Sequence, residues 1–238
     1  MNRRFALVLL ILSLAISGVA QRNDEPLPPN YKTVLENSIF RIIRVHYGPH
    51  EKVPVHDHPD TATVYVYLNN SGPVRIIHEE ETKPFTLVRP PTHKGAFRVS
   101  AGRLERHSIK NLGELESDFL RVELLRARLG DKTPEFRGPA PNDLTHNLSA
   151  TEYSSPHLSI ARTICASKTP CSIPASQESS VIVALSNSTI TSNGQSNSLD
   201  LGGVMAVPPR QSLLLSPIGD EPAHILQIVV HPARSANR

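Results

Sequence analysis

The feature that most constrains the fold of this 238-residue chain is a long series of short apolar runs, each closed by a turn-forming residue. The runs contain about four to eight residues, mostly Val, Ile and Leu, and 21 prolines and 12 glycines are spread through the chain around them. Short strands separated by turn residues are typical of antiparallel sandwiches and barrels. Beyond its first 20 residues the sequence therefore predicts an all-β protein.

Thirteen such runs are predicted to be β-strands, in two groups. The first group comprises residues 40–45, 63–68, 74–78, 85–88, 95–100, 106–110 and 118–125, and the second comprises residues 158–164, 181–185, 188–193, 203–207, 212–215 and 224–230. The turn at residues 69–72 (Asn-Asn-Ser-Gly) predicts a hairpin between the second and third strands. Residues 129–157 are rich in Pro, Gly, Asn and Ser and are predicted to be a linker.

The two groups present their elements in the same order. IIRV followed by VYVYLNN in the first group corresponds to IARTI followed by VIVALSN in the second. Gly113–Leu120 and Gly219–Leu226 likewise agree in length and polarity. This agreement predicts an internal duplication of one β-barrel unit, with a first domain at residues 31–128 and a second at residues 158–238.

The N-terminus has the layout of a secretory signal peptide. Arg3 and Arg4 form a positively charged segment, Phe5–Ile16 an apolar core and Gly18–Ala20 a small-residue cleavage site, so cleavage is expected after Ala20. The apolar core is shorter than the about 20 residues that a spanning helix needs. We expect a periplasmic or secreted protein with no stable membrane span, and the alternative is a retained N-terminal anchor.

Charge and cysteine content narrow the classes of partner. Removal of residues 1–20 takes two of the 25 basic residues and no acid, leaving 23 against 22 Asp and Glu. The sequence has no basic cluster of the kind that binds nucleic acid, so no nucleic-acid partner is expected. Cys165 and Cys171 are the only cysteines, and in an oxidising compartment their closeness favours a local disulfide.

Two histidines one residue apart carry the strongest chemical signal. His56 and His58 precede the predicted strand 63–68, and residues i and i+2 of a strand point to the same face. Two imidazoles placed in this way can bind one metal ion, although such a pair is also typical of a solvated turn. A third ligand is expected from a distant strand, and His107, in an H-x3-N pattern with Asn111, is the best candidate.

The H-x-H pair, the hairpin after it and H-x3-N about 50 residues later together resemble the two short motifs of the cupin superfamily. The resemblance covers nearly all of residues 31–128 and implies a small jelly-roll barrel whose motifs supply metal ligands from facing strands. It implies the ligands His56, His58 and His107, with Asn111 as a motif-associated residue. The whole chain is then expected to be a bicupin, all-β with two cupin-type jelly-roll barrels in tandem and a degenerate second barrel.

The first departure from the cupin pattern is a missing acid. A glutamate usually follows the histidine pair by four or five residues, where this chain has Ala62 and Thr63. Three neutral imidazoles leave a divalent ion with its full charge, so the expected site favours a small anionic or chelating molecule. The ligand set does not distinguish among Fe, Mn, Ni, Zn and Cu as the divalent metal.

Two further departures concern spacing. The segment from Gly48 to His56 is longer than in the usual first motif, and residues 100–107 replace the usual P-x-G-x-x-H of the second. An alignment of the second motif without a gap places Glu105, and not His107, in the ligand position. Glu105 is therefore an alternative or outer-shell ligand.

The second half has no comparable ligand set. Residues 173–176 (Ile-Pro-Ala-Ser) lie opposite the histidine pair, while Leu213 corresponds to His107 and Pro217 to Asn111. A structural role for this half is expected.

These observations predict an exported metal-binding cupin whose activity on a small anionic molecule is unassigned. The alternative is a non-catalytic ligand-binding or structural envelope protein with a relic metal site. Glu105, Tyr65 and Tyr67 are the candidate acid or base groups, and they do not decide between an enzyme and a binding protein. A homodimer is a possible assembly.

Overall fold

The computed structural model describes residues 26–79, 83–130 and 134–231, so the predicted leader at residues 1–20 lies outside the described ranges. Within these ranges the chain forms 19 β-strands and no α-helix. The described ranges accordingly hold no helix with the length and apolar character needed to cross a membrane. The all-β prediction is confirmed.

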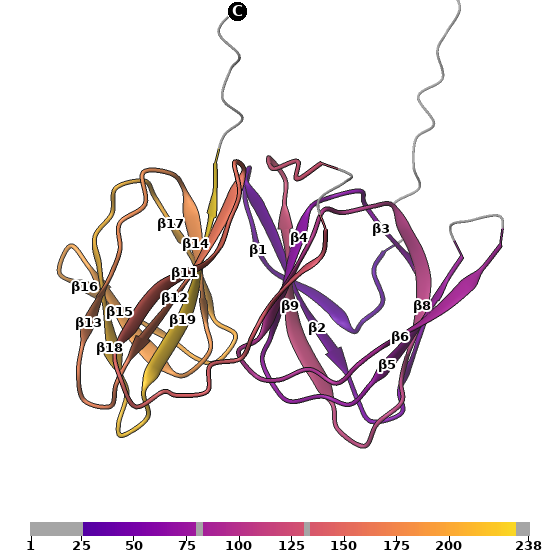
Figure 1. Cartoon of the computed structure of the whole chain (residues 1–238), viewed down its shortest axis with the longest axis horizontal. Coiled ribbons are helices and arrows are strands. Elements are labelled where there is room, and N and C mark those ends of the chain that lie inside the picture. Colours follow the sequence, from indigo (N-terminus) through magenta and orange to yellow (C-terminus); the bar gives the residue numbers. More distant parts are fainter. Residues whose placement is uncertain (1–25, 80–82, 131–133, 232–238) are drawn as a thin grey trace, which may run out of the picture.

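The strands build two barrels, which lie beside each other in Figure 1. The first barrel contains β1 (Tyr31–Glu36), β2 (Phe40–Tyr47), β3 (Lys52–His58), β4 (Thr63–Tyr67), β5 (Val74–His78), β6 (Phe85–Arg89), β7 (Phe97–Ser100), β8 (Glu105–Asn111), β9 (Ser117–Leu124) and β10 (Phe136–Gly138). The second contains β11 (Leu148–Ser154), β12 (Leu158–Cys165), β13 (Cys171–Ile173), β14 (Ser180–Ala184), β15 (Ser188–Ser192), β16 (Gln195–Leu199), β17 (Val204–Val207), β18 (Leu213–Pro217) and β19 (Ala223–Val230).

The two barrels have the same topology. The sheets of the first run β1-β2-β9-β4-β7-β10 and β3-β8-β5-β6, and those of the second run β11-β12-β19-β14-β17 and β13-β18-β15-β16. Apart from β10, each strand of the first barrel has a counterpart at the same sheet position of the second barrel, and the number of the counterpart is larger by ten. A register shift is also shared, since it lies between Thr33 and Leu35 in β1 and between Thr151 and Tyr153 in β11. The predicted duplication is confirmed at the level of topology.

All thirteen predicted runs are strands, with ends that differ from the prediction by at most two residues. The six further strands are β1, β3, β10, β11, β13 and β16, and every one of them lies at the edge of its sheet. An edge strand pairs on one side only and faces solvent, so it tolerates polar residues, bulges and proline. Its hydrophobic alternation is correspondingly weak.

Two connections between strands differ from what the sequence predicts. The predicted hairpin at residues 69–72 is wrong, because β4 pairs with β7 and β9 while β5 pairs with β6 and β8 in the other sheet. Turn residues signal a reversal of the chain but do not choose the pairing partner. The segment predicted as a linker, residues 129–157, contains β10, which pairs with β7, and β11, which pairs with β12.

The two barrels share one apolar core. Its buried residues come from β2, β4, β7 and β9 of the first barrel and from β12, β14 and β19 of the second. In β9, Leu120, Val122 and Leu124 belong to this core, while the intervening Arg121 and Glu123 are buried on the opposite face, inside the first barrel. The larger sheets of the barrels therefore pack against each other.

Equivalent arginines flank this interface. Arg44 of β2 forms a bidentate pair with Asp118, at 2.6 and 3.1 Å, and its guanidinium lies close to Gly202 of the second barrel. At the equivalent position of β12, Arg162 donates to the carbonyl oxygen of Gly95 in the first barrel at 2.9 Å. Each barrel thus extends an arginine toward a glycine of the other.

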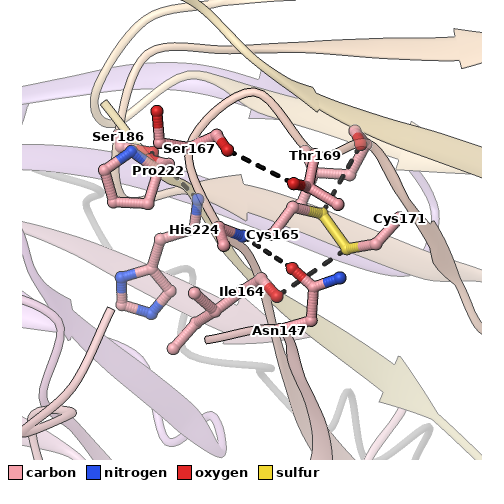
Figure 2. The surroundings of a disulfide bond; sticks show 11 residues. Asn147, Ile164, Cys165, Ser167, Thr169, Cys171, Ser186, Pro222 and His224 are labelled. Atoms are coloured by element: carbon pink, nitrogen blue, oxygen red, sulfur yellow. Dashed lines mark hydrogen bonds between the residues drawn. A yellow bond between two sulfur atoms is a disulfide. The ribbon is translucent and has the colours of Figure 1, made fainter. Parts of the chain in front are cut away.

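Figure 2 shows the disulfide between Cys165, the last residue of β12, and Cys171, the first residue of β13. The loop between them is also held by Asn147, whose side-chain oxygen accepts a hydrogen bond from the Ala166 amide at 2.7 Å. The disulfide ties a strand of the larger sheet to an edge strand of the smaller one.

The interface glycine Gly95 supports a first prediction. It has φ +82°, and an added Cβ would lie 3.0 Å from His224 Cε1 and 3.2 Å from Pro141 Cδ. Gly194 is a matched control, with φ +77° and no described atom within 4 Å. Both alanine substitutions carry a left-handed backbone penalty of about 1–2 kcal/mol, and crowding adds about 1–3 kcal/mol at Gly95. We expect Gly95→Ala to unfold at lower urea concentration than Gly194→Ala; equal midpoints would contradict close packing here.

A second prediction concerns pH. His224 is 3% exposed, and its Nε2 accepts a hydrogen bond from Arg162 Nη1 at 2.6 Å. Burial, followed by the charge of Arg162, lowers the pKa of His224 to about 3, against about 6.5 when unfolded. The unfolded chain therefore binds more protons between these pH values, so the stability present above pH 6.5 is lost as pH falls toward 3.

Wild type should lose about 3 kcal/mol of unfolding free energy relative to His224→Gln between pH 6.5 and pH 4. Urea unfolding at several pH values measures this difference, and parallel pH curves would show that the histidine does not contribute.

Candidate metal centre

A β-bulge in β3 sets the orientation of the histidine pair. β3 is antiparallel to β8, with Val53 opposite Ile109 and His56 opposite His107, so three steps along β3 match two along β8. The extra residue lies in Pro54–Val55, where proline lacks the amide needed for a regular ladder.

After the bulge the strand alternates in the usual way. His56 and His58 are buried, while Asp57 between them is exposed. In a regular strand the alternation from the buried Val53 would turn Val55 inward and both histidines outward. The bulge therefore turns the H-x-H pair into the barrel.

The pairing of β3 with β8 brings three histidines together. His56, His58 and His107 are 2–5% exposed, and each offers a ring nitrogen that lies within 4.8 Å of those of the other two. The ring centroids are 4.8–5.1 Å apart. The structure thus contains the three-histidine group that the sequence predicts.

The three imidazoles are neutral at physiological pH. Burial is the largest cause in each case, and the charge of Arg121 acts in the same direction; together they lower the pKa of His56 and His58, and that of His107 to about 3. His56 Nδ1 lies 2.8 Å from the Pro54 carbonyl oxygen and therefore donates to it. Its Nε2 consequently keeps a lone pair.

The histidines fit a transition metal. Nδ1 of His58 and Nδ1 of His107 are buried without a hydrogen-bond partner among the described residues. A buried polar nitrogen without a hydrogen-bond partner costs free energy, so a purely structural packing role does not account for these two nitrogens. Neutral imidazoles that converge from two strands are the donor set that Zn, Cu, Fe and Ni prefer.

Glu105 lies beside this group but is engaged elsewhere. It is opposite His58 in the strand pair, and its carboxylate lies 3.4 Å from Arg121 Nη1 and 3.7 Å from Arg103 Nε. Burial raises its pKa, but neighbouring groups, of which Arg121 has the largest effect and Arg98 and Arg103 also contribute, outweigh burial, so the net pKa is lowered. A ring nitrogen of His107 lies within 4.8 Å of those of His56 and His58, and Glu105 does not belong to this group.

The remaining motif positions have structural surroundings. Asn111 is fully buried; its Nδ2 donates to the carbonyl oxygens of Gly48 and Leu115 at 2.9 and 2.8 Å, so it holds two loops in place. Ala62 and Thr63, where the cupin pattern has its glutamate, are buried, and the Thr63 hydroxyl donates to a backbone carbonyl. Neither of these two positions supplies a carboxylate.

A cavity opens beside the histidines. It encloses about 640 Å³ of empty space, part of it open to solvent. Its lining includes His58, His107, Glu105, four tyrosines (Tyr31, Tyr47, Tyr65 and Tyr67), three arginines (Arg89, Arg98 and Arg121) and Phe119. Both candidate tyrosines, Tyr65 and Tyr67, are thus at the cavity, and the Tyr65 hydroxyl accepts a hydrogen bond from Arg121 Nη1 at 2.9 Å.

Sequence reasoning missed several of these residues. Arg121 could have been found from the strand pattern of β9, in which charged residues alternate with Leu and Val on a doubly buried strand. Arg98 of β7 alternates in the same way between Phe97 and Val99. Tyr31 gave no signal, because its edge strand was not predicted.

In the second barrel, apolar side chains occupy the positions equivalent to the histidines. Ile173 pairs with Leu213 where His56 pairs with His107. Both belong to a buried apolar cluster that also contains Ile190, Leu215 and Ile225. The predicted loss of a ligand set in this half agrees with the observed packing.

Comparison with known proteins extends these findings. No protein-family model and no curated protein matches the sequence. Among solved structures, AerE from Microcystis aeruginosa aligns with TM-score 0.58 at 14% identity, over 85% of this chain and 98% of that one. A variant of oxalate decarboxylase from Bacillus subtilis aligns with TM-score 0.55 at 15% identity, over 84% and 71% of the two chains.

A salicylate 1,2-dioxygenase from Pseudaminobacter salicylatoxidans aligns with TM-score 0.54 at 10% identity, over 84% of this chain and 75% of that one. Oxalate decarboxylase and salicylate dioxygenase are cupins. At these identities the likeness concerns the fold, and it agrees with the duplicated topology and with the motif resemblance. The chain therefore has the fold of the cupin superfamily, with two jelly-roll barrels in tandem as in a bicupin.

Proposed function

We propose that the first barrel binds one divalent transition-metal ion through His56, His58 and His107 and holds a small anionic molecule beside it. The observation that carries the proposal is the convergence of three buried, neutral imidazoles. The oxalate decarboxylase from Bacillus subtilis, which shares the fold, has Mn(II) centres. When bound, the metal supplies a positive charge that no carboxylate at positions 62 and 63 cancels.

The charges around the cavity support an anionic ligand. Three arginines and one glutamate line it. Burial, followed by the neighbouring charge of Arg98, lowers the pKa of Arg89, as expected where guanidinium groups gather in a confined space. Glu135 pairs with Arg89 and Arg98, and Arg121 pairs with Glu105 and Glu123, so the charge left for a carboxylate to balance is that of the metal.

Arg98 is the arginine best placed to bind such an anion. Its side chain is 6% exposed, its Nη1 donates to Glu135 at 2.6 Å, and its guanidinium carbon lies 3.8 Å from the centre of the Tyr65 ring. Its Nε is buried and has no hydrogen-bond partner among the described residues. A buried charged donor without a partner is costly, so an incoming oxygen that accepts from it is favoured.

The cavity also has an apolar side. Tyr47, Tyr67 and Phe119 line it together with Val74 and Ile76. These features suit a small carboxylate, either without a ring or with one aromatic ring, and two proteins of the same fold are named for oxalate and salicylate.

We also propose that the mature chain is exported after cleavage behind Ala20. The sequence of residues 1–20 supports this location. The disulfide between Cys165 and Cys171 supports it as well, because such bonds persist in oxidising compartments.

The metal site is tested by elemental analysis of the purified mature chain. Wild type should carry about one equivalent of metal, and His56→Ala and His107→Ala should each lose it, because two imidazoles hold a divalent ion poorly. Glu105→Gln should keep the metal, since its carboxylate is engaged by Arg121. The exposed His50 provides a control, His50→Ala, that should also keep it. Wild type that stays metal-free after incubation with Fe, Mn, Ni, Zn or Cu would refute the proposal.

The anion site is tested by calorimetric titration of the metal-loaded protein with oxalate and with salicylate. We expect at least one of them to bind, and Arg98→Gln to weaken binding by about tenfold or more, because a hydrogen bond to a charged group contributes about 1.5–3 kcal/mol. The control is Arg106→Gln, whose side chain is 44% exposed and paired with Asp57. Equal affinities of wild type and Arg98→Gln, or no binding of either acid, would contradict the assignment.

A further inference from the structure

Tyr31, from the edge strand β1, reaches the histidine cluster. Its hydroxyl oxygen lies 2.9 Å from His56 Nε2, and its ring centroid lies 4.7 Å from that of His56 and 5.3 Å from that of His58. Because His56 Nδ1 donates to the Pro54 carbonyl, Nε2 is the acceptor and the Tyr31 hydroxyl is the donor. The phenol O–H therefore forms a hydrogen bond to the lone pair of His56 Nε2, which is the lone pair that a metal would use.

This contact places the phenol oxygen within reach of a metal bound to His56. A metal on Nε2 must displace the hydrogen bond, while the oxygen remains next to the nitrogen. Two donor atoms 2.9 Å apart, each about 2.0–2.1 Å from one ion, subtend about 90° at that ion. Adjacent ligands of a five- or six-coordinate metal meet at this angle. The phenol therefore reaches the ion when its oxygen turns off the lone-pair axis of Nε2 and stays beside the nitrogen.

We propose that Tyr31 is the fourth protein ligand of the metal and takes the place of the acid that is missing at positions 62 and 63. The inference rests on the proposed metal site. On binding, the O–H bond of Tyr31 breaks, an oxygen–metal bond forms and the proton passes to water. The phenolate then supplies the single negative charge that a glutamate would have supplied.

Burial raises the pKa of Tyr31, so the charge of the metal must offset burial when the phenolate forms. The hydrogen bonds of Tyr31 set it apart from the other tyrosines. The Tyr47 hydroxyl oxygen lies 2.6 Å from the Tyr31 hydroxyl oxygen. Because the Tyr31 hydroxyl donates its proton to His56, the Tyr47 hydroxyl is the donor in this second hydrogen bond. This hydrogen bond persists when the phenol becomes a phenolate. The Tyr65 hydroxyl instead contacts Arg121.

The second barrel offers an internal comparison. Tyr31 pairs with Val45 in β1–β2, and at the equivalent place in β11–β12 Ser149 pairs with Thr163. Ser149 is exposed. The barrel without the histidines thus also lacks the tyrosine, as expected if the four side chains form one site.

The test uses iron, because ferric iron bound to a phenolate absorbs visible light. The full mature chain is loaded with ferrous iron without oxygen, and ferricyanide then takes one electron from each iron and becomes ferrocyanide. Absorption and resonance Raman spectra are recorded for wild type, Tyr31→Phe and Tyr47→Phe, with iron content measured in parallel. Tyr31→Phe retains the aromatic ring, which belongs to a buried cluster with Ile43 and Val53. Thermal unfolding of the metal-free variants checks that they fold.

Wild type should show a visible charge-transfer band with enhanced tyrosinate vibrations. Tyr31→Phe should lose both, still bind iron through three histidines, and bind it at least about tenfold more weakly. Tyr47→Phe should keep the band. Iron-loaded wild type without the band, or a band that survives in Tyr31→Phe, would overturn the role of Tyr31 and leave the three-histidine site intact. Wild type that binds no iron or other metal would instead overturn the proposed function, and this inference with it.

Discussion

The one-residue bulge in β3 is the constraint on which the candidate site depends. It places His56 opposite His107, turns His58 to the same interior, and leaves the Pro54 carbonyl free to accept the Nδ1 proton of His56. Orientation and tautomer thus come from a single irregularity of the backbone. The corresponding strand of the second barrel has no bulge, since Cys171 to Ile173 matches Leu215 to Leu213 residue for residue. The two barrels differ in backbone as well as in side chains at this point.

The strand β9 shows how one fold serves two purposes. Leu120, Val122 and Leu124 face the other barrel. Arg121 and Glu123 are buried on the opposite face, where Arg121 lines the cavity. In β19 the interface face is conserved in character, with Leu226 and Ile228, but the inner face carries Ile225 and Gln227. The residues that face the other barrel and those that face the barrel interior alternate along the same strand, so either set can differ between the two barrels without changing the other. This independence allows one barrel to hold a polar site while the other is filled with apolar side chains.

Much of the fold could be predicted because interior strands must be apolar. Thirteen strands, the duplication and the three histidines followed from alternation and spacing. Six of the eight edge strands did not, because pairing on one side leaves their sequences polar. Asn111 followed from a motif, but its loop-holding role needed the structure. Tyr31 was missed with its edge strand, and the alternation of Arg98 with Phe97 and Val99 shows only that Arg98 faces the barrel interior. Their place at the cavity results from pairings between strands far apart in the chain, which no local pattern of residues records.

The shared core has a consequence for how this protein can be divided. Each barrel contributes one whole face of its larger sheet to that core, and on the first barrel this face includes Phe40, Val64 and Val66. Cutting the chain between β10 and β11 would leave two fragments, each with an apolar face in contact with water, and such faces drive self-association. The second barrel, whose described residues form no comparable ligand set, thus covers an apolar face of the first barrel that would otherwise contact water.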